Sequence, residues 1–569
     1  MLPLEAGSSD PDAPGATDGD DSASPLDGGV SAPDSATQLP PSGQPAPAGT
    51  SSAVLTFHND NYRTGTQIAE RQLDVAKVKT RGMKLAFTNP LIREVNAQPL
   101  YVPGLMVQGK ARNVTFVATL ANYVLAYDTD EPSNNPAGSS KELWETRFDD
   151  PEDAMARPSA RGVYSTPVID LATNTMYLVF STRNTSNDTG MLTEGQTAAL
   201  DVEFFLGALD IRDGKILRTK KIVGTYPDSK GVQVAFEAKN HWCRPGLLLS
   251  HGSLYVGCGM RNHEMTTMFR GWVFRYDAAT FNQQATFCTA PDVKVPNEGA
   301  SIWQSGGGLA EDEAGNIYFI TGNGPAEFQN HLYGDALIKL STAGGGLAVT
   351  GAFTSETPDG KLDLNDVDFG AGGALVLPDA PYVLGAGKTG IAYLLSRADM
   401  MKRQEFEAGV NQYNPTAPVD VNWEGGPHMH GTPNYWRAPI AGQGYLYSWA
   451  EQDYLRRQTF DIASGRFDQT KAIAGKVRAL QAVMPGGIMS ISANGSLAGS
   501  GIVWATLPAT SDPDSDPTSR LFAFDAETLD TLWQTMLPSL PKWMPPTIAD
   551  GKVIMATSSE QLLIYTLGP

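Results

Sequence analysis

Two histidines stand two residues apart in "GGPHMHGTPNYW", residues 425–436. Side chains at positions i and i+2 of a β-strand point to the same face, so the imidazoles of His428 and His430 can address one cavity. With a nearby carboxylate, Glu451 or Asp453, they could hold zinc, copper or iron. One imidazole could instead act as a general base, or both could only hydrogen-bond neighbouring segments. Because no third histidine has diagnostic spacing, the residues favour the last, structural alternative over a metal site.

A repeated unit surrounds these histidines along most of the chain. A segment marked by Pro or Gly leads into a short apolar strand, a turn and an aromatic-rich strand, as in "STPVIDLATNTMYLVF" and "RPGLLLSHGSLYVGC". A third strand and an outer strand follow, as in "LFAFDAETLD" and "DTLWQTML". The units start roughly every 55 to 80 residues, a span that suits four strands and their loops. Eight such units predict an all-β fold, a single eight-bladed β-propeller over residues 53–569 with almost no helix.

The two ends of the chain carry different signals. The last unit stops at Pro569 after its third strand, and we expect residues 83–91 (MKLAFTNPL) to supply its outer strand, which removes two exposed edges. Residues 1–52 are rich in Asp, Ser, Pro, Ala and Gly and contain no aromatic residue, which predicts a disordered acidic linker. "LEAGS" followed by this linker resembles the mature start of a bacterial lipoprotein whose anchoring cysteine is absent. We therefore expect an extracytoplasmic protein (periplasmic, outer-membrane-associated or secreted) with a lipid-anchored tether.

The overall charge excludes one class of partner. The chain has 42 Lys and Arg against 62 Asp and Glu, a formal net charge of -20, and no basic patch stands out. A polyanion such as nucleic acid is therefore excluded as a partner. No apolar run reaches the length of about 18 residues that a membrane-spanning helix needs, so we expect no transmembrane segment.

The three cysteines, Cys243, Cys258 and Cys288, lack C-x-x-C spacing, which argues against a zinc or thioredoxin-like site. A two-residue turn at 251–252 would place Cys243 and Cys258 on one face of a hairpin, diagonal to each other. That separation allows a disulfide bond. Two buried free thiols are an equally good interpretation, and the sequence leaves both open.

Several motifs connect the repeats with a known family. In "AFDAETLDTLW" an Ala-x-Asp turn precedes a Trp in the outer strand (Ala523, Asp525 and Trp533), with Leu529 where Gly is usual. This pattern resembles the docking motif of the pyrroloquinoline quinone (PQQ) repeat family, the quinoprotein-like propellers. "FHNDNYRTG" (residues 57–65), "IWQSGGGLAED" and "YGDALIKLS" make the chain most similar to bacterial extracytoplasmic PQQ-repeat proteins of unassigned activity. The resemblance covers residues 53–569 and makes PQQ with calcium a possible cofactor.

The propeller fold brings distant residues together. In a blade of this type, the segment leading into the innermost strand and the turn between the second and third strands lie on the same face. Polar side chains that converge on one concave face form the default ligand site. The main candidates are Arg244, Trp303, Gln304, Asp368, Lys388, His428, His430 and Glu451. The same rule adds Arg261, His263, Glu264, Asn323, His331, Asp366 and Asp453 to this rim.

Three functions are compatible with such a rim. The first is a binding propeller for a small molecule, glycan or protein partner, with mixed charges that favour a neutral or weakly anionic ligand. The second is a PQQ-dependent oxidoreductase, an alcohol or sugar dehydrogenase, in which calcium polarises the bound quinone. Typical alcohol-oxidising members of the family have an adjacent cysteine pair and regular docking tryptophans, and this chain departs from both. The third is a metal-dependent hydrolase or lyase that uses His428 and His430.

Overall fold

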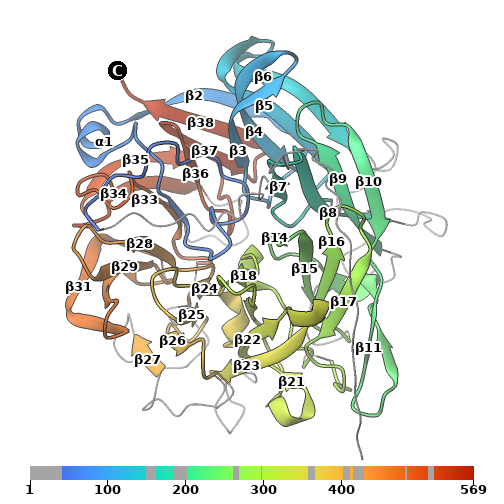
Figure 1. Ribbon diagram of the computed structural model, residues 1–569. Helices are drawn as coiled ribbons and strands as arrows, with labels where there is room; N and C mark the ends of the chain where they lie inside the picture. The colour runs from blue at the N-terminus through green and yellow to red at the C-terminus, as the bar shows by residue number, and fades with distance from the viewer. Residues whose placement is uncertain are drawn as a thin grey trace, which may run out of the picture.

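Eight sheets of four or five strands, antiparallel except where β1 (Thr66–Gln67) joins one of them, stand around a common axis and follow one another in chain order (Figure 1). The structure is a computed structural model. It describes residues 42–148, 162–183, 202–260, 268–296, 298–355, 366–400, 410–413, 428–480, 483–510 and 518–569. The arrangement confirms the predicted eight-bladed β-propeller.

The first four sheets are named blades 1 to 4, and their strands run outward from the axis. Blade 1 consists of β3 (Leu100–Val107), β4 (Lys110–Ala118), β5 (Tyr123–Asn134) and β6 (Ala137–Arg147). Blade 2 consists of β7 (Val168–Asp170), β8 (Thr175–Arg183), β9 (Val202–Asp210) and β10 (Ile216–Lys221). Blade 3 consists of β14 (Leu248–Ser250), β15 (Ser253–Met260), β16 (Trp272–Asp277) and β17 (Gln283–Cys288), with β13 (His241–Trp242) beside β15. Blade 4 consists of β18 (Ala310–Glu311), β19 (Ile317–Ile320), β22 (Ala336–Ser341) and β23 (Ala348–Thr354).

Blades 5 to 8 complete the ring. Blade 5 consists of β24 (Leu375–Val376), β25 (Tyr382–Ala386), β26 (Ala392–Ser396) and β27 (Val410–Tyr413). Blade 6 consists of β28 (Asn434–Arg437), β29 (Gln443–Ser448), β30 (Tyr454–Asp461) and β31 (Arg466–Arg478). Blade 7 consists of β32 (Ile488–Ser492), β33 (Ile502–Pro508), β34 (Ser519–Asp525) and β35 (Thr531–Leu537). Blade 8 consists of β36 (Thr547–Ala549), β37 (Lys552–Thr557), β38 (Gln561–Leu567) and β2 (Met83–Pro90).

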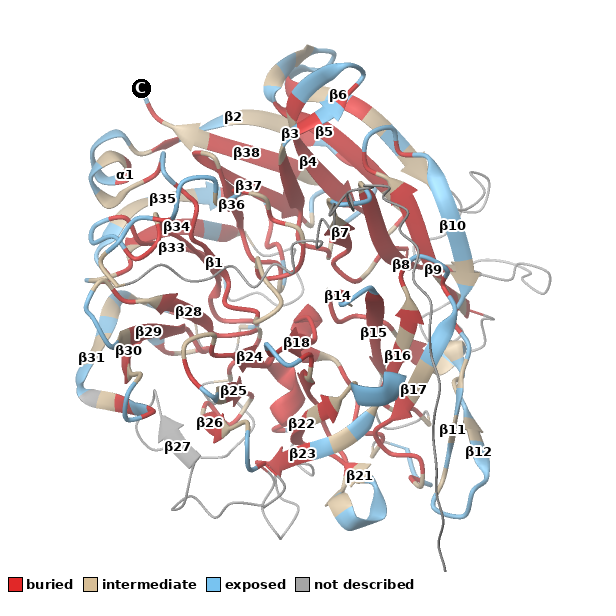
Figure 2. Ribbon diagram, viewed as in Figure 1, coloured by how far each residue is buried: buried red, intermediate tan, exposed pale blue. Residues whose placement is uncertain are grey.

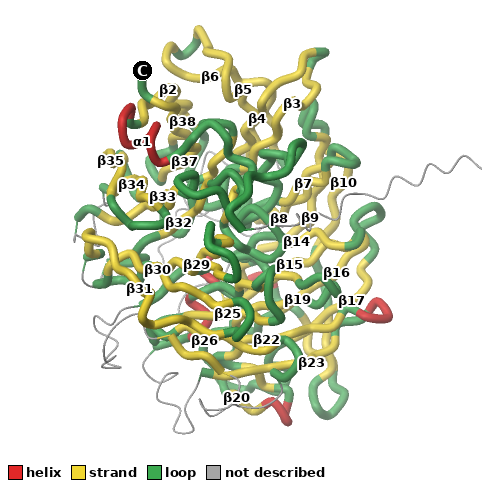
Figure 3. Tube along the Cα trace, turned by 60° about the vertical axis from the view of Figure 1, so that its left-hand side comes forward, coloured by secondary structure: helices red, strands yellow, loops and turns green. Residues whose placement is uncertain are grey.

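Shorter elements decorate the ring. The two-stranded sheets are β11 (Thr225–Pro227) with β12 (Gln233–Ala235) and β20 (Ala326–Glu327) with β21 (Leu332–Tyr333). The 3₁₀ turns are η2 (Ala238–Asn240), η3 (Gln304–Gly306), η4 (Phe328–Asn330), η5 (Ala343–Gly345) and η6 (Phe369–Ala371). The short helix α1 (Val75–Arg81) starts at Asp74, whose side chain accepts the Lys77 N–H, and lies at the edge of the ring (Figure 3). Among the described residues, no helix has the length and apolarity needed to cross a membrane.

The core is divided among the spaces between neighbouring blades. Strands β33 and β37 are buried along their whole length, because both faces of a blade pack against the next blade. The outer strand β10 is largely exposed, and Figure 2 shows this change from buried inner strands to exposed outer strands. Burial on both faces explains why the inner strands read as continuous apolar runs.

The ring is closed by strands from the two ends of the described chain. Strand β2 pairs antiparallel with β38, in a register that runs from Met83 opposite Leu567 to Pro90 opposite Gln561. This pairing agrees with the closure expected for residues 83–91. It covers the edge that β38 would otherwise expose.

Residues 54–70, here called the inner belt, wind once around the inside of the ring. The belt includes β1 (Thr66–Gln67), which pairs parallel with β32. Its hydrogen bonds reach blades 1 to 8 in order, joining Val54 to Tyr101, Leu55 to Ile169, Thr56 to Leu247, Asn61 to Glu311, Tyr62 to Val376, Thr64 to Tyr435, Gly65 to Ile491 and Glu70 to Gly551. The segment "FHNDNYRTG" therefore holds the blades together from within.

Contacts with the ring begin before the inner belt. Ser496 donates its backbone N–H to the Gln44 carbonyl at 2.9 Å, and Ala46 donates to the Asn494 side chain at 3.0 Å. Residues 42–52 thus contact blade 7, inside the stretch that the sequence assigns to the linker. Residues 1–41 lie outside the described residues, and for them the linker stays a prediction.

Cys243 and Cys258 form a disulfide bond, which resolves the alternative that the sequence left open. The turn at 251–252 places Ser250 opposite Ser253, but β13 pairs with β15 in a register shifted by two residues. The shift sets Cys243 directly opposite Cys258 rather than diagonal to it, with 3.9 Å between the Cα atoms. Cys288 is a buried free thiol, and burial raises its pKa to about 12.

Candidate functional site

The face of the ring on which the innermost strands begin, here called the leading face, contains a cavity of roughly 230 Å³. The segments leading into these strands and the turns between second and third strands supply its walls, as the sequence predicts. The lining residues are Trp242, Met260, Phe269, Ser301, Trp303, Gly322, Asn323, Asp366, Asp368, Ala371, Lys388, His430, Met484 and Trp543. They come from blades 3 to 8, so the cavity lies across the ring rather than within one blade.

Three tryptophans form an aromatic wall. The rings of Trp242 and Trp303 are stacked with centroids 5.9 Å apart, and Trp543 meets Trp303 edge-on at 5.8 Å. Trp303 stands just before η3, and Trp543 stands between β35 and β36. Indole faces in such a wall are suited to stacking against a sugar ring or another planar ring.

A lysine and two aspartates form a charged cluster opposite the indoles. The Lys388 ammonium lies 2.6 Å from Asp368 and 2.8 Å from Asp366. Burial disfavours the charged lysine, but the attraction of the two carboxylates outweighs it and raises the pKa of Lys388 above its ordinary range. Asn323 donates to Asp366 at 3.1 Å. The cluster is therefore a fixed set of charges at the cavity wall.

Arg244 lies behind the aromatic wall and is almost completely buried. Its guanidinium stands 4.5 Å from the ring centroid of Tyr164 and about 6 Å from those of Trp303 and Trp543. Only Nη1 is hydrogen-bonded, to the carbonyls of Asn96 and Tyr164, whereas Nε and Nη2 have no hydrogen-bond partner in the described part of the chain. Burial lowers the pKa of Arg244.

His428, His430 and Glu451 meet at the edge of the cavity. Each offers one ligand atom, and these atoms all lie within 4.8 Å of one another. The histidines precede β28 instead of lying in it, yet their ring centroids are only 6.1 Å apart. Burial lowers the pKa of His428, although the Glu451 carboxylate acts in the opposite direction. Both histidines therefore lie close to Glu451, although they are not in a strand as the i, i+2 argument assumed.

Backbone hydrogen bonds fix the segment that carries the histidines. Met429 donates to the Gly387 carbonyl at 3.2 Å, and Gly431 donates to the Ala371 carbonyl at 3.3 Å, which connects blade 6 to blade 5. Glu451 donates its N–H to the His428 carbonyl at 3.0 Å. These bonds hold the three side chains in place without using any of their polar atoms.

Of the predicted rim residues, six line the cavity: Trp303, Asn323, Asp366, Asp368, Lys388 and His430. His428, Glu451 and Arg244 adjoin it. Gln304 does not, because its amide bonds the backbone of Gly307 and Ile320.

The remaining five rim predictions have different outcomes. Asp453 is bound by Arg456 in a two-point ion pair, so Glu451 is the carboxylate that joins the histidines. His331 is exposed at the end of η4. Residues 261–264, which include three predicted rim residues, lie outside the described residues.

Sequence reasoning missed several lining residues. Trp242, Trp543 and Met484 stand in segments that lead toward innermost strands, the same position that identified Trp303. The positional rule could therefore have found them, but they are apolar and were not considered as candidates. Met260 and Phe269 flank residues 261–267, for which the sequence offers no comparable signal.

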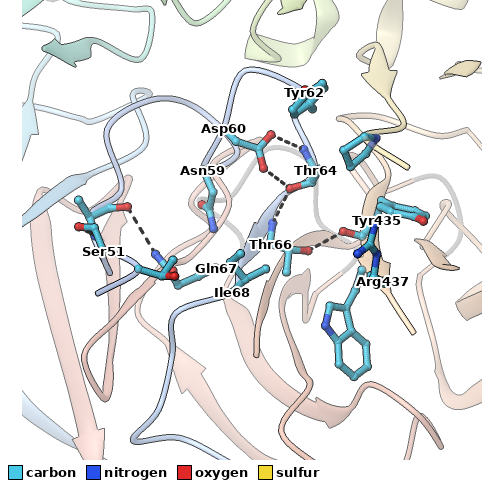
Figure 4. A pocket seen from close by; sticks show the side chains of 14 residues that line it. Ser51, Asn59, Asp60, Tyr62, Thr64, Thr66, Gln67, Ile68, Tyr435 and Arg437 are labelled. Atoms are coloured by element: carbon cyan, nitrogen blue, oxygen red, sulfur yellow. Dashed lines mark hydrogen bonds between the residues drawn. The ribbon is translucent and has the colours of Figure 1, made fainter. Parts of the chain in front are cut away.

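The opposite end of the ring, here called the trailing face, has a small pocket of roughly 60 Å³ between the inner belt and blades 5 and 6. Figure 4 shows how the belt fills this region: the Asp60 carboxylate accepts from the N–H and hydroxyl of Thr64, and Thr66 donates to the Tyr435 carbonyl. Burial raises the pKa of Asp60, while its hydrogen bonds from Thr64 act in the opposite direction. Both Asn59 amide atoms are an exception, because they have no partner among the described residues.

Comparisons with known proteins define the fold. No protein-family model matches the chain, and no curated protein sequence matches it. The quinohemoprotein alcohol dehydrogenase ADHIIG from Pseudomonas putida HK5 is similar in structure, with a TM-score of 0.53 and 15% identity, covering 91% of this chain and 80% of that one. A europium-containing methanol dehydrogenase has a TM-score of 0.54 and 14% identity, covering 91% and 99%.

BamB from Moraxella catarrhalis superposes less well, with a TM-score of 0.33 and 12% identity over 64% of this chain and 91% of that one. The two dehydrogenase structures and the blade arrangement identify the fold as an eight-bladed propeller of quinoprotein type.

Proposed function

We propose that the protein is an extracytoplasmic propeller that binds a small, polar, ring-containing molecule in the cavity of the leading face. The observation that carries this proposal is the pairing of the three-tryptophan wall with the Lys388–Asp366–Asp368 cluster in one cavity. Ligand sites commonly combine an apolar surface for contact with a few fixed polar groups for orientation.

The chemistry of the two walls limits the ligand. Indole faces stack on flat rings, while the lysine and the aspartates can donate to and accept from hydroxyl or carboxyl groups on the same ring. The cluster holds charges of both signs, which does not favour a polyanion. The disulfide between Cys243 and Cys258 supports a location outside the cytoplasm, since such bonds persist in oxidising compartments.

Tryptophan fluorescence tests the proposal. Monosaccharides, sugar acids and PQQ would be titrated separately, and we expect saturable quenching by at least one of these classes. Trp303→Phe should weaken that binding about tenfold or more, because it removes part of the stacking surface. Trp144→Phe is the matched control, since Trp144 lies in the outer strand β6. No binding by any class, or equal effects of both variants, would contradict the proposal.

A second candidate is a quinone cofactor with a hard cation. Asn323, Asp366 and Asp368 bring three oxygen-bearing side chains to the cavity, the ligand type that calcium takes. Two similar structures are a quinohemoprotein and a europium-containing dehydrogenase by name. The aromatic wall and the oxygen donors fit such a group, with Trp303 to stack on the quinone and the two aspartates to hold the cation.

The cysteines do not fit the alcohol-oxidising pattern. Cys243 and Cys258 are 15 residues apart, and both are buried within blade 3 with Cys288 instead of lining the cavity. A bound quinone would supply hydride acceptance, and Lys388 would supply a fixed positive charge beside it. Titration with PQQ in the presence of calcium or lanthanum, followed by a dye-reduction assay with alcohols and sugars, separates this candidate from simple ligand binding.

A further inference from the structure

The side chains of His430 and Glu451 approach each other without forming a hydrogen bond. Nε2 of His430 and Oε1 of Glu451 are 3.0 Å apart, and the two side chains are 3% and 4% exposed. Neither atom has a hydrogen-bond partner in the described part of the chain. Two buried polar atoms at this distance but without hydrogen-bond alignment leave a cost of about 1 to 3 kcal/mol each, unless a third group binds both.

A metal ion is a group that can bind both atoms. Ligand atoms about 2.1 Å from one ion, at angles between square and tetrahedral, lie roughly 3.0 to 3.4 Å apart. The observed 3.0 Å separation falls in this range. His428 completes a set of three atoms within 4.8 Å. Small side-chain rotations could therefore bring all three atoms to one ion, because backbone hydrogen bonds already fix the segment.

We propose that His428, His430 and Glu451 bind one divalent transition-metal ion at the edge of the leading-face cavity. Two imidazoles and one carboxylate suit zinc or iron(II) rather than calcium or magnesium, which prefer oxygen ligands. Because His430 also lines the cavity, coordination positions of the ion remain open toward it. This site has a different ligand chemistry from the Asn323–Asp366–Asp368 cluster and does not depend on the ligand proposed above.

Metal titration of the full-length, untagged protein tests the inference. After dialysis against a chelator, zinc alone would be added in a calorimeter, and we expect one ion per chain. Cobalt(II) provides a spectroscopic test, because imidazole and carboxylate ligation in a low-coordinate site gives visible absorption bands that zinc addition removes. Calcium should give neither heat of binding at this site nor competition with cobalt.

Variants assign the ligands. Glu451→Gln preserves volume and leaves the backbone bond to His428 intact, and we expect zinc affinity to fall at least about a hundredfold. His430→Ala should have a similar effect. His331→Asn is the matched control because His331 is exposed and distant from the three ligands in the chain, and its affinity should be unchanged.

The outcomes separate folding from binding. Circular dichroism would verify that each variant folds. If His430→Ala does not fold, Glu451→Asp would replace it, because it keeps the carboxylate but moves it back by one methylene. Weaker zinc binding by the folded variants with an unchanged His331→Asn supports the site. Absence of zinc binding to the parent protein, or equal affinity in all variants, would overturn it.

Discussion

The inner belt and the leading-face cavity differ in how the chain treats buried charge, and two arginines show this most clearly. In the inner belt, the Arg63 guanidinium is fully buried and all three nitrogens donate, to the carbonyls of Leu309, Leu247, Phe57 and Asp60 and to the Thr56 hydroxyl. At the leading face, Arg244 is buried to the same extent, yet two of its nitrogens have no partner in the described part of the chain.

Under the proposed function, this difference separates groups that stabilise the fold from groups that contact the ligand. The inner belt satisfies the innermost strands with its own backbone, and the pocket beside it measures roughly 60 Å³. The leading face keeps a larger cavity with charged and aromatic walls. Buried polar groups without partners are costly, so those of Arg244, His430 and Glu451 beside the cavity are candidates for contact with a ligand.

Removal of the inner belt and β2 should have the largest effect on the molecule. A truncation that lacks residues 1–91 exposes the edge of β38 and eight sets of inner-strand contacts, and we expect no cooperative melting, or a midpoint lower by at least about 10 °C. Differential scanning calorimetry measures this. A truncation lacking only residues 1–41 is the control and should melt as the full chain does. Equal melting of both truncations would show that the belt does not hold the ring.

The two arginines provide the next comparison. Arg63→Met removes the donors for five acceptors and should lower the free energy of unfolding by about 4 kcal/mol. Arg244→Met breaks two hydrogen bonds but also removes two buried N–H groups without acceptors, so its cost should be smaller by at least about 2 kcal/mol. Denaturant midpoints compare the two variants. A larger effect at Arg244 would reverse the distinction between the inner belt and the leading face.

The loss of stability in acid that comes from the belt residue His58 should be smaller than the effects of the arginine variants, but measurable. Burial lowers the pKa of His58 to about 4, against about 6.5 in an unfolded chain, so the unfolded state binds more protons between these values. Stability is therefore lost as the pH falls through this window, by about 2 kcal/mol at pH 5 from the His58 imidazole alone. Burial raises the pKa of nearby Asp60, so this carboxyl instead adds stability as the pH falls.

His58→Asn should remove this contribution while accepting the positive φ of 56° at the position. We expect the parent to lose about 2 kcal/mol more than the variant between pH 7 and pH 5, measured from urea denaturation at each pH. His331→Asn should behave as the parent. Parallel pH profiles for the parent and His58→Asn would mean that burial in the belt does not keep the His58 imidazole neutral.

The smallest effect is expected at the charged cluster of the leading face. The Asp366 side chain is 55% exposed and that of Asp368 only 13% exposed, although both contact Lys388. Asp366→Asn should change the free energy of unfolding by less than about 1 kcal/mol, because solvent screens an exposed pair. Asp368→Asn should cost about 1.5 kcal/mol. Thermal melts at low and high salt would measure both, and a larger loss for Asp366→Asn would contradict the assigned burial.

The sequence was informative wherever a pattern repeats. Eight units with similar strand and turn signals predict the blades, and the missing strand after "LLIYTL" predicts the β2–β38 pairing. The leading-face positions of Trp303, Lys388 and His430 followed from their places in the units. Periodicity is visible in one chain because every blade solves the same packing problem.

Features without a repeat were not predictable. The path of the inner belt depends mainly on backbone donors and acceptors, which leave little signature in side-chain identity. The register shift between β13 and β14 places Cys243 opposite Cys258, and no turn motif in the sequence predicts this shift. Gln304 has a polar amide of the kind found in ligand sites, but this amide hydrogen-bonds two backbone groups. Such local hydrogen bonds compete with function for the same polar side chains.

The inner belt also constrains how proteins of this shape can evolve. Proteins built from repeats commonly gain or lose whole units by duplication and deletion of the corresponding coding segment. Here residues 54–70 contact the blades one after another, and the contact sequence ends when the eighth is reached. A duplicated blade would have no belt residue to bond with, and deletion of a blade would leave one belt residue without its partner. The number of blades therefore depends on a short segment outside the repeats, and it can change only if this segment and the repeats change together.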